Sequence, residues 1–139
     1  MCFVSFRYFK FIGIYDFFRC AFRENISLGD TAALETGPIP EERLDKAIEL
    51  AGLTPAAENL PKGYDSPLGK LLEDGVDLAG GEWQRVAMAR TILGPAEVKI
   101  LDEPTAALDP LAESEVYENF QQISEGKTTL FISHRLGST

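Results

Sequence analysis

The sequence predicts an α/β fold with parallel strands, and three features of its carboxyl-terminal part support this. The short apolar run at residues 98–101 is typical of a strand buried inside a parallel sheet. The β-rich stretch Thr128–Ile132 predicts a second strand. Strand, helix and strand in this order form a right-handed βαβ unit with parallel strands. The helix between them is expected from apolar side chains at helical spacing, namely Ala112, Val116, Phe120 and Ile123.

Two adjacent carboxylates, Asp102 and Glu103, stand directly after the first of these strands, which Pro104 ends. Ligands of open α/β sheets bind at the carboxyl ends of the strands. Neighbouring carboxylates repel each other unless a hard cation such as Mg²⁺ is bound, and Mg²⁺ usually arrives with phosphates. One carboxylate would then face the metal, and the other would orient a water for attack on a phosphoryl group. An ordinary loop that carries Asp-Glu-Pro is the alternative interpretation.

A pair of glycines, Gly80 and Gly81, precedes a helix that is expected to begin near Glu82. Glycine lets backbone N–H groups approach a phosphate closely. The amino-terminal end of a helix also carries a partial positive charge that favours anions. The alternative is a helix cap without a ligand. Trp83 is expected to pack, and the core face of the helix is expected at Val86, Ala89, Ile92 and Leu93.

The single histidine of the chain, His134, follows the second predicted strand. Because the carboxyl ends of parallel strands meet at one edge of a sheet, His134 is expected beside Asp102 and Glu103. A lone histidine is otherwise more often a structural residue.

These three segments resemble, in order and spacing, motifs of the ATP-binding subunit of exporter-type ABC transporters. Residues 78–90, Leu-Ala-Gly-Gly-Glu-Trp-Gln-Arg-Val-Ala-Met-Ala-Arg, are similar to the signature motif of that subunit. Residues 98–109 are similar to its Walker B motif and the loop that follows, and His134 is similar to its switch histidine. The resemblance implies a P-loop NTPase core with parallel strands and an inserted helical subdomain.

The resemblance also implies a role for each matching residue. Asp102 would hold Mg²⁺ through water, Glu103 would be the general base, and His134 would contact the γ-phosphate. Asp109 would lie across the dimer contact, and it is also a good cap for a helix that starts at Pro110. Contacts to ATP bound on the opposite subunit are expected from Leu78, Ala79, Gly80, Gly81, Glu82, Gln84 and Asp109.

By the same resemblance, the function would be ATP hydrolysis that powers substrate export, with ATP and Mg²⁺ as cofactors. The expected partners are a second nucleotide-binding domain, in a dimer, and a transmembrane subunit that would hold the chain at the cytoplasmic face of the membrane. Residues 23–26, Arg-Glu-Asn-Ile, resemble the start of the helical subdomain, whose face meets the membrane subunit. Two rival readings stay open. One is a non-catalytic module that lends its signature surface to a complete partner, and the other is a non-functional fragment.

Three departures from the family pattern bear on activity. Ala79 replaces a serine whose hydroxyl would bond the γ-phosphate, a loss of roughly 1.5–3 kcal/mol. Tyr15 stands where the family has a glutamine that reaches the metal. The chain contains no Gly-x-x-x-x-Gly-Lys-Ser/Thr loop, which would lie before residue 1. We therefore expect residues 1–139 to be a single partial nucleotide-binding domain that is inactive in isolation. Its helical subdomain and signature would occupy about residues 23–90, and the Walker B and histidine part residues 91–139.

Composition limits the remaining classes of function. A length of 139 residues fits one domain, and the formal net charge of −9 argues against a nucleic-acid partner. Charged residues interrupt the aromatic segment 1–22 too often for it to span a membrane. Cys2 and Cys20 show no metal-binding spacing, which indicates a reducing compartment.

Further elements are expected upstream of the signature segment. The apolar run Phe9–Tyr15 predicts a strand, and an amphipathic helix is expected with Pro40 at its first position and Gly52 as its stop. Residues 55–59 predict another short helix. Lys99 is unexpected inside a buried strand, because an unpaired ammonium is expensive to bury. Either its stem reaches an edge of the sheet, or the sheet is less well enclosed than that of the family.

Overall fold

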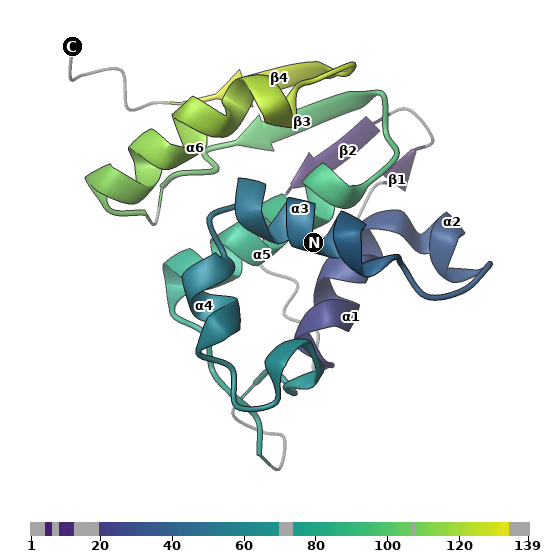
Figure 1. Ribbon diagram of the computed structural model, residues 1–139. Coiled ribbons are helices and arrows are strands. Elements are labelled where there is room, and N and C mark those ends of the chain that lie inside the picture. Colours follow the sequence, from purple (N-terminus) through teal and green to yellow (C-terminus); the bar gives the residue numbers. More distant parts are fainter. Residues whose placement is uncertain (1–4, 7–8, 13–19, 70–73, 107, 134–139) are drawn as a thin grey trace.

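The computed structural model describes residues 5–6, 9–12, 20–69, 74–106 and 108–133. Figure 1 shows the sheet with α6 beside it at the top and the remaining helices grouped below. None of the helices in the described part of the chain is long and apolar enough to cross a membrane. The elements, in chain order, are β1 (Ser5–Phe6), β2 (Phe9–Ile12), α1 (Phe22–Ser27), η1 (Leu28–Asp30), α2 (Thr31–Leu34), α3 (Glu41–Leu50), α4 (Thr54–Glu58), η2 (Gly63–Asp65), α5 (Gly80–Leu93), β3 (Val98–Asp102), α6 (Pro110–Ile123) and β4 (Thr128–Ile132).

The described strands form one sheet in the order β1–β2–β3–β4. β2 is parallel to β3, and β3 is parallel to β4, whereas β1 pairs with β2 in the antiparallel direction. The predicted strand–helix–strand unit with parallel strands is therefore confirmed. β4 has the predicted bounds, and β3 extends one residue further, to Asp102. β2 is described as far as Ile12, and the rest of the strand expected to reach Tyr15 lies outside the described residues.

The helices pack against one face of β3 and β4. Leu101 is fully buried on this face, and its register partner Phe131 lies 5.3 Å from the ring of Tyr117 on α6. Leu130, which points to the other face because side chains alternate along a strand, is 52% exposed. In the described part of the sheet, one face is thus enclosed, whereas the other is only partly covered.

Helix α5 is the centre of the helical part and packs against α1, η1 and α3. Its predicted core face is confirmed, since Val86, Ala89 and Leu93 are buried and Ile92 is half-buried. Trp83 packs as expected and is 8% exposed. The largest fully buried apolar side chains of the described residues are Phe22, Ile26, Leu53, Leu68, Met88 and Leu101.

A buried polar pair joins α1 to α5. Arg90 is 5% exposed and Asn25 is fully buried. The guanidinium donates from Nε to the Asn25 backbone carbonyl at 2.6 Å and from Nη2 to the Asn25 Oδ1 at 2.6 Å. Gly29 lies so close to the Arg90 carbonyl that a Cβ at this position would overlap it. The pair and the glycine fix where the first helix docks.

Two predicted helix starts are wrong by one or two residues. Pro40 has extended backbone angles (φ −55°, ψ 137°) and precedes α3, which begins at Glu41. Helix α5 begins at Gly80 rather than near Glu82, because the Glu82 carboxylate reaches back to the N–H before the helix. Gly52 follows α3 with φ +66°, a left-handed conformation that ends the helix as expected.

Lys99 lies on the enclosed face of β3 and is 3% exposed. Its ammonium donates from Nζ to the Ile92 carbonyl at 3.2 Å, at the end of α5. The stem therefore runs to a helix end inside the structure, and the expectation that it reaches an edge of the sheet is wrong. Burial, together with the charge of Lys127, lowers the pKa of Lys99 to about 8.

Candidate functional site

The loop after β3 presents the two adjacent carboxylates to solvent. Asp102 ends the strand, and Asp102 and Glu103 are both exposed. Glu103 has φ +45°, which is uncommon for a residue with a side chain. Its N–H donates to the Ile132 carbonyl at 2.8 Å, and its carbonyl accepts the Ala106 N–H at 3.1 Å. The sharp turn at Glu103 is thus held by β4 on one side and by its own loop on the other.

The start of α5 is bonded to this loop. Gln84 donates from Nε2 to the Glu103 carbonyl at 2.7 Å. One hydrogen bond therefore brings the glycine-bearing helix and the acidic loop together, although they are 19 residues apart. The sequence predicts both segments, but it does not predict the hydrogen bond between them.

The amino-terminal end of α5 is accessible. Gly80 is exposed, and a Cβ on it would meet no described atom within 4 Å. The Ala79 N–H donates to the Glu82 carboxylate at 2.7 Å, so this side chain closes part of the helix end. Leu78, by contrast, is 7% exposed and belongs to the core, which leaves its backbone for any external contact.

Asp109 caps α6, as the sequence predicts. Its Oδ1 accepts the Leu111 N–H at 3.0 Å, and Pro110 is the first residue of the helix. Asp109 is also exposed, so the capping role does not remove it from the surface.

Sequence reasoning missed a hydroxyl and carboxylate network behind the acidic loop. Thr105, 2% exposed, donates from Oγ1 to the Glu113 Oε1 at 2.9 Å. The Tyr117 hydroxyl lies 3.4 Å from the same carboxylate oxygen and 3.5 Å from the Ser133 hydroxyl. The network joins the loop after β3 to the end of β4. Its one sequence signal is an acid in the first turn of α6, four residues before a tyrosine.

The structure brings part of the predicted site residues together. Gln84 and Glu103 are brought together, and Asp102 is next to Glu103 in the chain. Gly80 lies at the start of the same helix as Gln84. His134 lies outside the described residues, although Ile132, two residues before it, is bonded to Glu103.

The carboxylates of this loop suit a magnesium ion that is bound together with phosphates. They do not form a site in which protein side chains alone would surround the ion. In the described residues, no cluster of three or more His, Cys, Asp or Glu side chains could hold a metal ion. Mg²⁺ bound with nucleotides usually takes one or two carboxylates and completes its shell with water and phosphate oxygens. Asp102, at the end of β3, can supply such a carboxylate.

Comparisons with known proteins agree with this fold. The ABC transporter family model matches residues 19–106. The nisin transport ATP-binding protein NisT of Lactococcus lactis subsp. lactis is 40% identical over 116 residues, which cover 84% of this chain and 19% of that protein. The ATP-dependent lipid A-core flippase of Pseudomonas aeruginosa is 40% identical over 114 residues, 82% of this chain and 18% of that protein.

A solved structure of a bacterial Atm1-family ABC exporter with ATP bound matches with a TM-score of 0.69 and 34% identity. The match covers 86% of this chain and 19% of that chain. The fold is that of an ABC-type P-loop NTPase, in which a parallel sheet is combined with helices. The chain belongs to the ABC transporter family, and it spans less than a fifth of the length of the relatives named here. Membership implies nucleotide binding in general.

Proposed function

We propose that this chain is part of an ATP-binding domain of an ABC exporter and that its acidic loop serves Mg²⁺-dependent ATP hydrolysis. The observation that carries the proposal is the hydrogen bond from Gln84 to Glu103. It joins the exposed amino-terminal end of α5 to the loop with the two carboxylates. Phosphoryl transfer requires an anion-binding helix end, a carboxylate that holds the metal ion and a base that accepts the proton of the attacking water.

Each residue has a defined part in this proposal. Bound Mg²⁺ would neutralise charge that develops on the phosphates. Asp102 would hold the ion through water, and Glu103 would accept a proton from the attacking water, a role typically worth 10²–10⁴-fold in rate. His134 would stabilise the γ-phosphate.

A second nucleotide-binding domain would complete the site. The exposed Gly80, the half-buried Gly81 and the following N–H groups of α5 would close over ATP held by that partner, with Asp109 at the contact. Glu82 weakens this anion site, because its carboxylate occupies one N–H at the helix end and repels a phosphate. Ala79 offers no hydroxyl in compensation.

The proposal includes a membrane partner. A mostly apolar groove of about 580 Å³ lies between α1 and the start of α3, with Leu28, Leu34 and Ile39 in its wall and Arg23 and Glu24 at its rim. An apolar face of a helix from a transmembrane subunit suits such a groove. The chain would then sit at the cytoplasmic face of the membrane. Its helical, signature-bearing part would be residues 23–90, and residues 91–139 would be the sheet part of the same domain.

The test is steady-state phosphate release by this chain in complex with a complete ABC ATP-binding subunit. Glu103→Gln is expected to lower the rate by about 10²–10⁴-fold. Glu58→Gln, a matched change of an exposed carboxylate on α4, is expected to leave it unchanged.

A rival function, a non-catalytic pairing module, predicts a different pattern. It is favoured by the exposed and unobstructed Gly80, which suits docking on a partner's nucleotide. In that case Gly80→Asp abolishes turnover by the partner, while Glu103→Gln leaves the rate at the wild-type value. The second result would refute the catalytic role of Glu103.

A further inference from the structure

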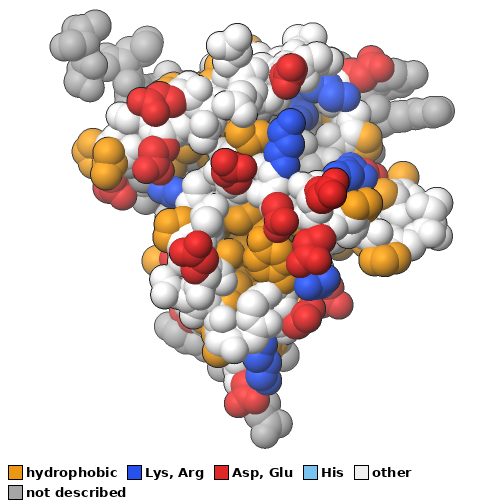
Figure 2. Space-filling view, viewed as in Figure 1, with side chains coloured by type: hydrophobic (Ala, Val, Ile, Leu, Met, Phe, Trp, Pro, Cys, Tyr) orange, Lys and Arg blue, Asp and Glu red, His pale blue; other side chains and the backbone are white. Residues whose placement is uncertain are grey.

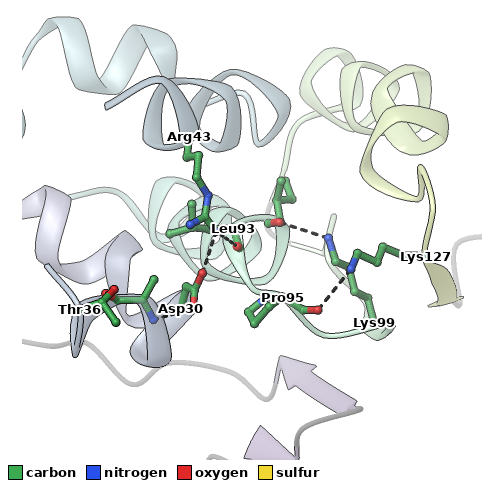
Figure 3. A network of polar contacts seen from close by, with 9 residues as sticks. Asp30, Thr36, Arg43, Leu93, Pro95, Lys99 and Lys127 are labelled. Carbon is green, nitrogen blue, oxygen red and sulfur yellow. Dashed lines mark hydrogen bonds and ion pairs between the residues drawn. The ribbon is translucent and has the colours of Figure 1, made fainter. Parts of the chain in front are cut away.

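A cavity at the far end of α5 collects basic side chains from three separate elements. It has a volume of about 320 Å³ and is lined by Arg43 and Lys46 of α3, Lys99 of β3 and Lys127 of the turn before β4. We call it the basic cavity. Figure 3 shows Arg43, Lys99 and Lys127 directed toward the end of α5. Among the described residues that line the cavity, Glu125 is the one that is acidic.

The gathering of cations contrasts with the rest of the protein. The chain has a formal net charge of −9, and Figure 2 shows acidic side chains spread over the face in view. In a chain with this net charge, four basic side chains around one cavity indicate a local interaction that stabilises them.

The end of α5 accounts for part of this charge. Arg43 donates to the Leu93 carbonyl, Lys99 to the Ile92 carbonyl and Lys127 to the Pro95 carbonyl, each at 3.2 Å. Unpaired carbonyls and the negative end of the helix dipole favour cations there. That dipole equals only about half an elementary charge.

The remaining charge is not balanced within the cavity wall. Arg43 is paired with Asp30 at 2.7 Å, which leaves three lysines facing one glutamate. Each ammonium carries three N–H donors, and in the described structure Lys99 and Lys127 each give one of them to a carbonyl. Lys99 lines the cavity and is 3% exposed, so little of its side chain reaches bulk water.

The electrostatics of Lys99 point the same way. Burial is the larger cause of its lowered pKa, about 8, and the charge of Lys127 adds to it. Below that pH the ammonium is charged, buried and repelled by a second cation. A bound anion would relieve this repulsion.

We propose that the basic cavity binds a multivalent oxyanion of the phosphate class, at a site separate from the carboxylate loop. Lys46, Lys99 and Lys127 contact the anion, and Arg43, already paired, shapes the wall. The volume is roughly ten times the share of one water in the liquid, so a phosphate fits with part of its hydration shell. The source is either a free phosphate or the phosphate tail of a nucleotide. This proposal is independent of the proposed function.

The test is isothermal titration calorimetry of the full chain at low ionic strength, with inorganic phosphate, pyrophosphate and Mg²⁺-free ATP as probes. Lys127→Gln and Lys46→Gln are each expected to weaken binding of pyrophosphate by about tenfold, a reasonable loss for one charge-assisted contact. Lys62→Gln is the matched control, because this exposed lysine lies outside the cavity and pairs with Asp74. Circular dichroism of each variant confirms folding before the titration.

The probes also distinguish the two sources. Binding of phosphate or pyrophosphate without ATP identifies a free anion, and competition by ATP that Lys127→Gln weakens identifies a nucleotide tail. Either result upholds the site. Absence of binding by all three probes, or affinities that Lys127→Gln and Lys46→Gln leave unchanged, would overturn the proposal.

A pH series tests the role of Lys99 by itself. Sulfate keeps its charge between about pH 7 and pH 9, whereas Lys99 loses its proton in this range. Sulfate affinity is therefore expected to fall as pH rises past about 8 in the wild type. In Lys99→Met the affinity is expected to be lower and independent of pH over that range. An equal pH dependence in both proteins would remove Lys99 from the site.

Discussion

Removal of the Asn25 side chain takes one acceptor from the buried Arg90 guanidinium and so measures what fixes α1 to α5. Asn25→Ala keeps the backbone carbonyl that accepts from Nε but deletes the Oδ1 that accepts from Nη2 at 2.6 Å. It also deletes the Nδ2 donors that bond the carbonyls of Cys20 and Ala21, each at 3.2 Å. The helix backbone is otherwise free to stay as it is.

The expected loss follows from the burial of the pair. A hydrogen bond to a charged group is worth about 1.5–3 kcal/mol, and a buried charge that loses a partner raises the penalty toward about 3–5 kcal/mol. Because Arg90 keeps one acceptor on Asn25, we expect about 3 kcal/mol for Asn25→Ala. Arg90→Met removes the charge itself and is expected to lose less, about 1–2 kcal/mol, from the loss of its two hydrogen bonds to Asn25.

Urea denaturation followed by tryptophan fluorescence measures both values. Trp83 is the single tryptophan, lies on α5 and is 8% exposed, so its emission reports the packing of this helix. The double variant Asn25→Ala/Arg90→Met is expected to be no less stable than Asn25→Ala alone, since it no longer buries a charge that has lost an acceptor. Additive losses in the double variant would refute the reasoning, because the two residues would then act independently.

Three other changes test separate parts of the structure. Gly29→Ala places a Cβ against a backbone carbonyl, and urea denaturation is expected to show a loss of about 3 kcal/mol in the free energy of unfolding. Gly80→Ala, with open space around the new Cβ, is expected to change this free energy by no more than about 1 kcal/mol. Lys99 has a pKa of about 8 in the folded chain against its ordinary 10.5, so the unfolded chain binds more protons and stability from this residue rises with pH between these values. Lys99→Met is therefore expected to be more stable than wild type by up to about 3 kcal/mol below pH 8, with the difference shrinking toward pH 10.5; a constant difference in thermal melts across this range would contradict the assignment. Thr105→Val removes the hydroxyl bonded to Glu113 and is expected to speed amide hydrogen exchange at residues 105 and 106, whereas Thr105→Ser is expected to keep the wild-type rate.

The elements that were predicted well from the sequence are those that a pattern of neighbouring residues determines. Residues 98–101 and 128–132 are short β-rich runs, and the helix between them has a regular apolar stripe, so their pairing follows from general rules of connection. The helix starts were less accurate, because a cap depends on which side chain reaches a given N–H. Glu82 moved the start of α5 to Gly80 in this way.

The contacts that hold the fold and the candidate site together depend on partners that are distant in sequence. Arg90 and Asn25 are 65 residues apart, and neither residue type indicates the other. Lys99 looked misplaced in its strand until the end of α5 supplied a carbonyl for it. The carboxylate pair was predictable because it directly follows a strand, whereas the bond from Gln84 required the fold.

The Gln84 amide has a mechanical consequence. Its hydrogen bond links the helix that carries the glycines to the turn at Glu103. A second hydrogen bond, from the Glu103 N–H to the Ile132 carbonyl, links the same turn to β4. A small rotation of α5 would pull on the carbonyl of Glu103 and swing the carboxylate, since a left-handed turn has little room to absorb the motion elsewhere. A force that displaces the helical part of this chain would therefore also shift its acidic loop.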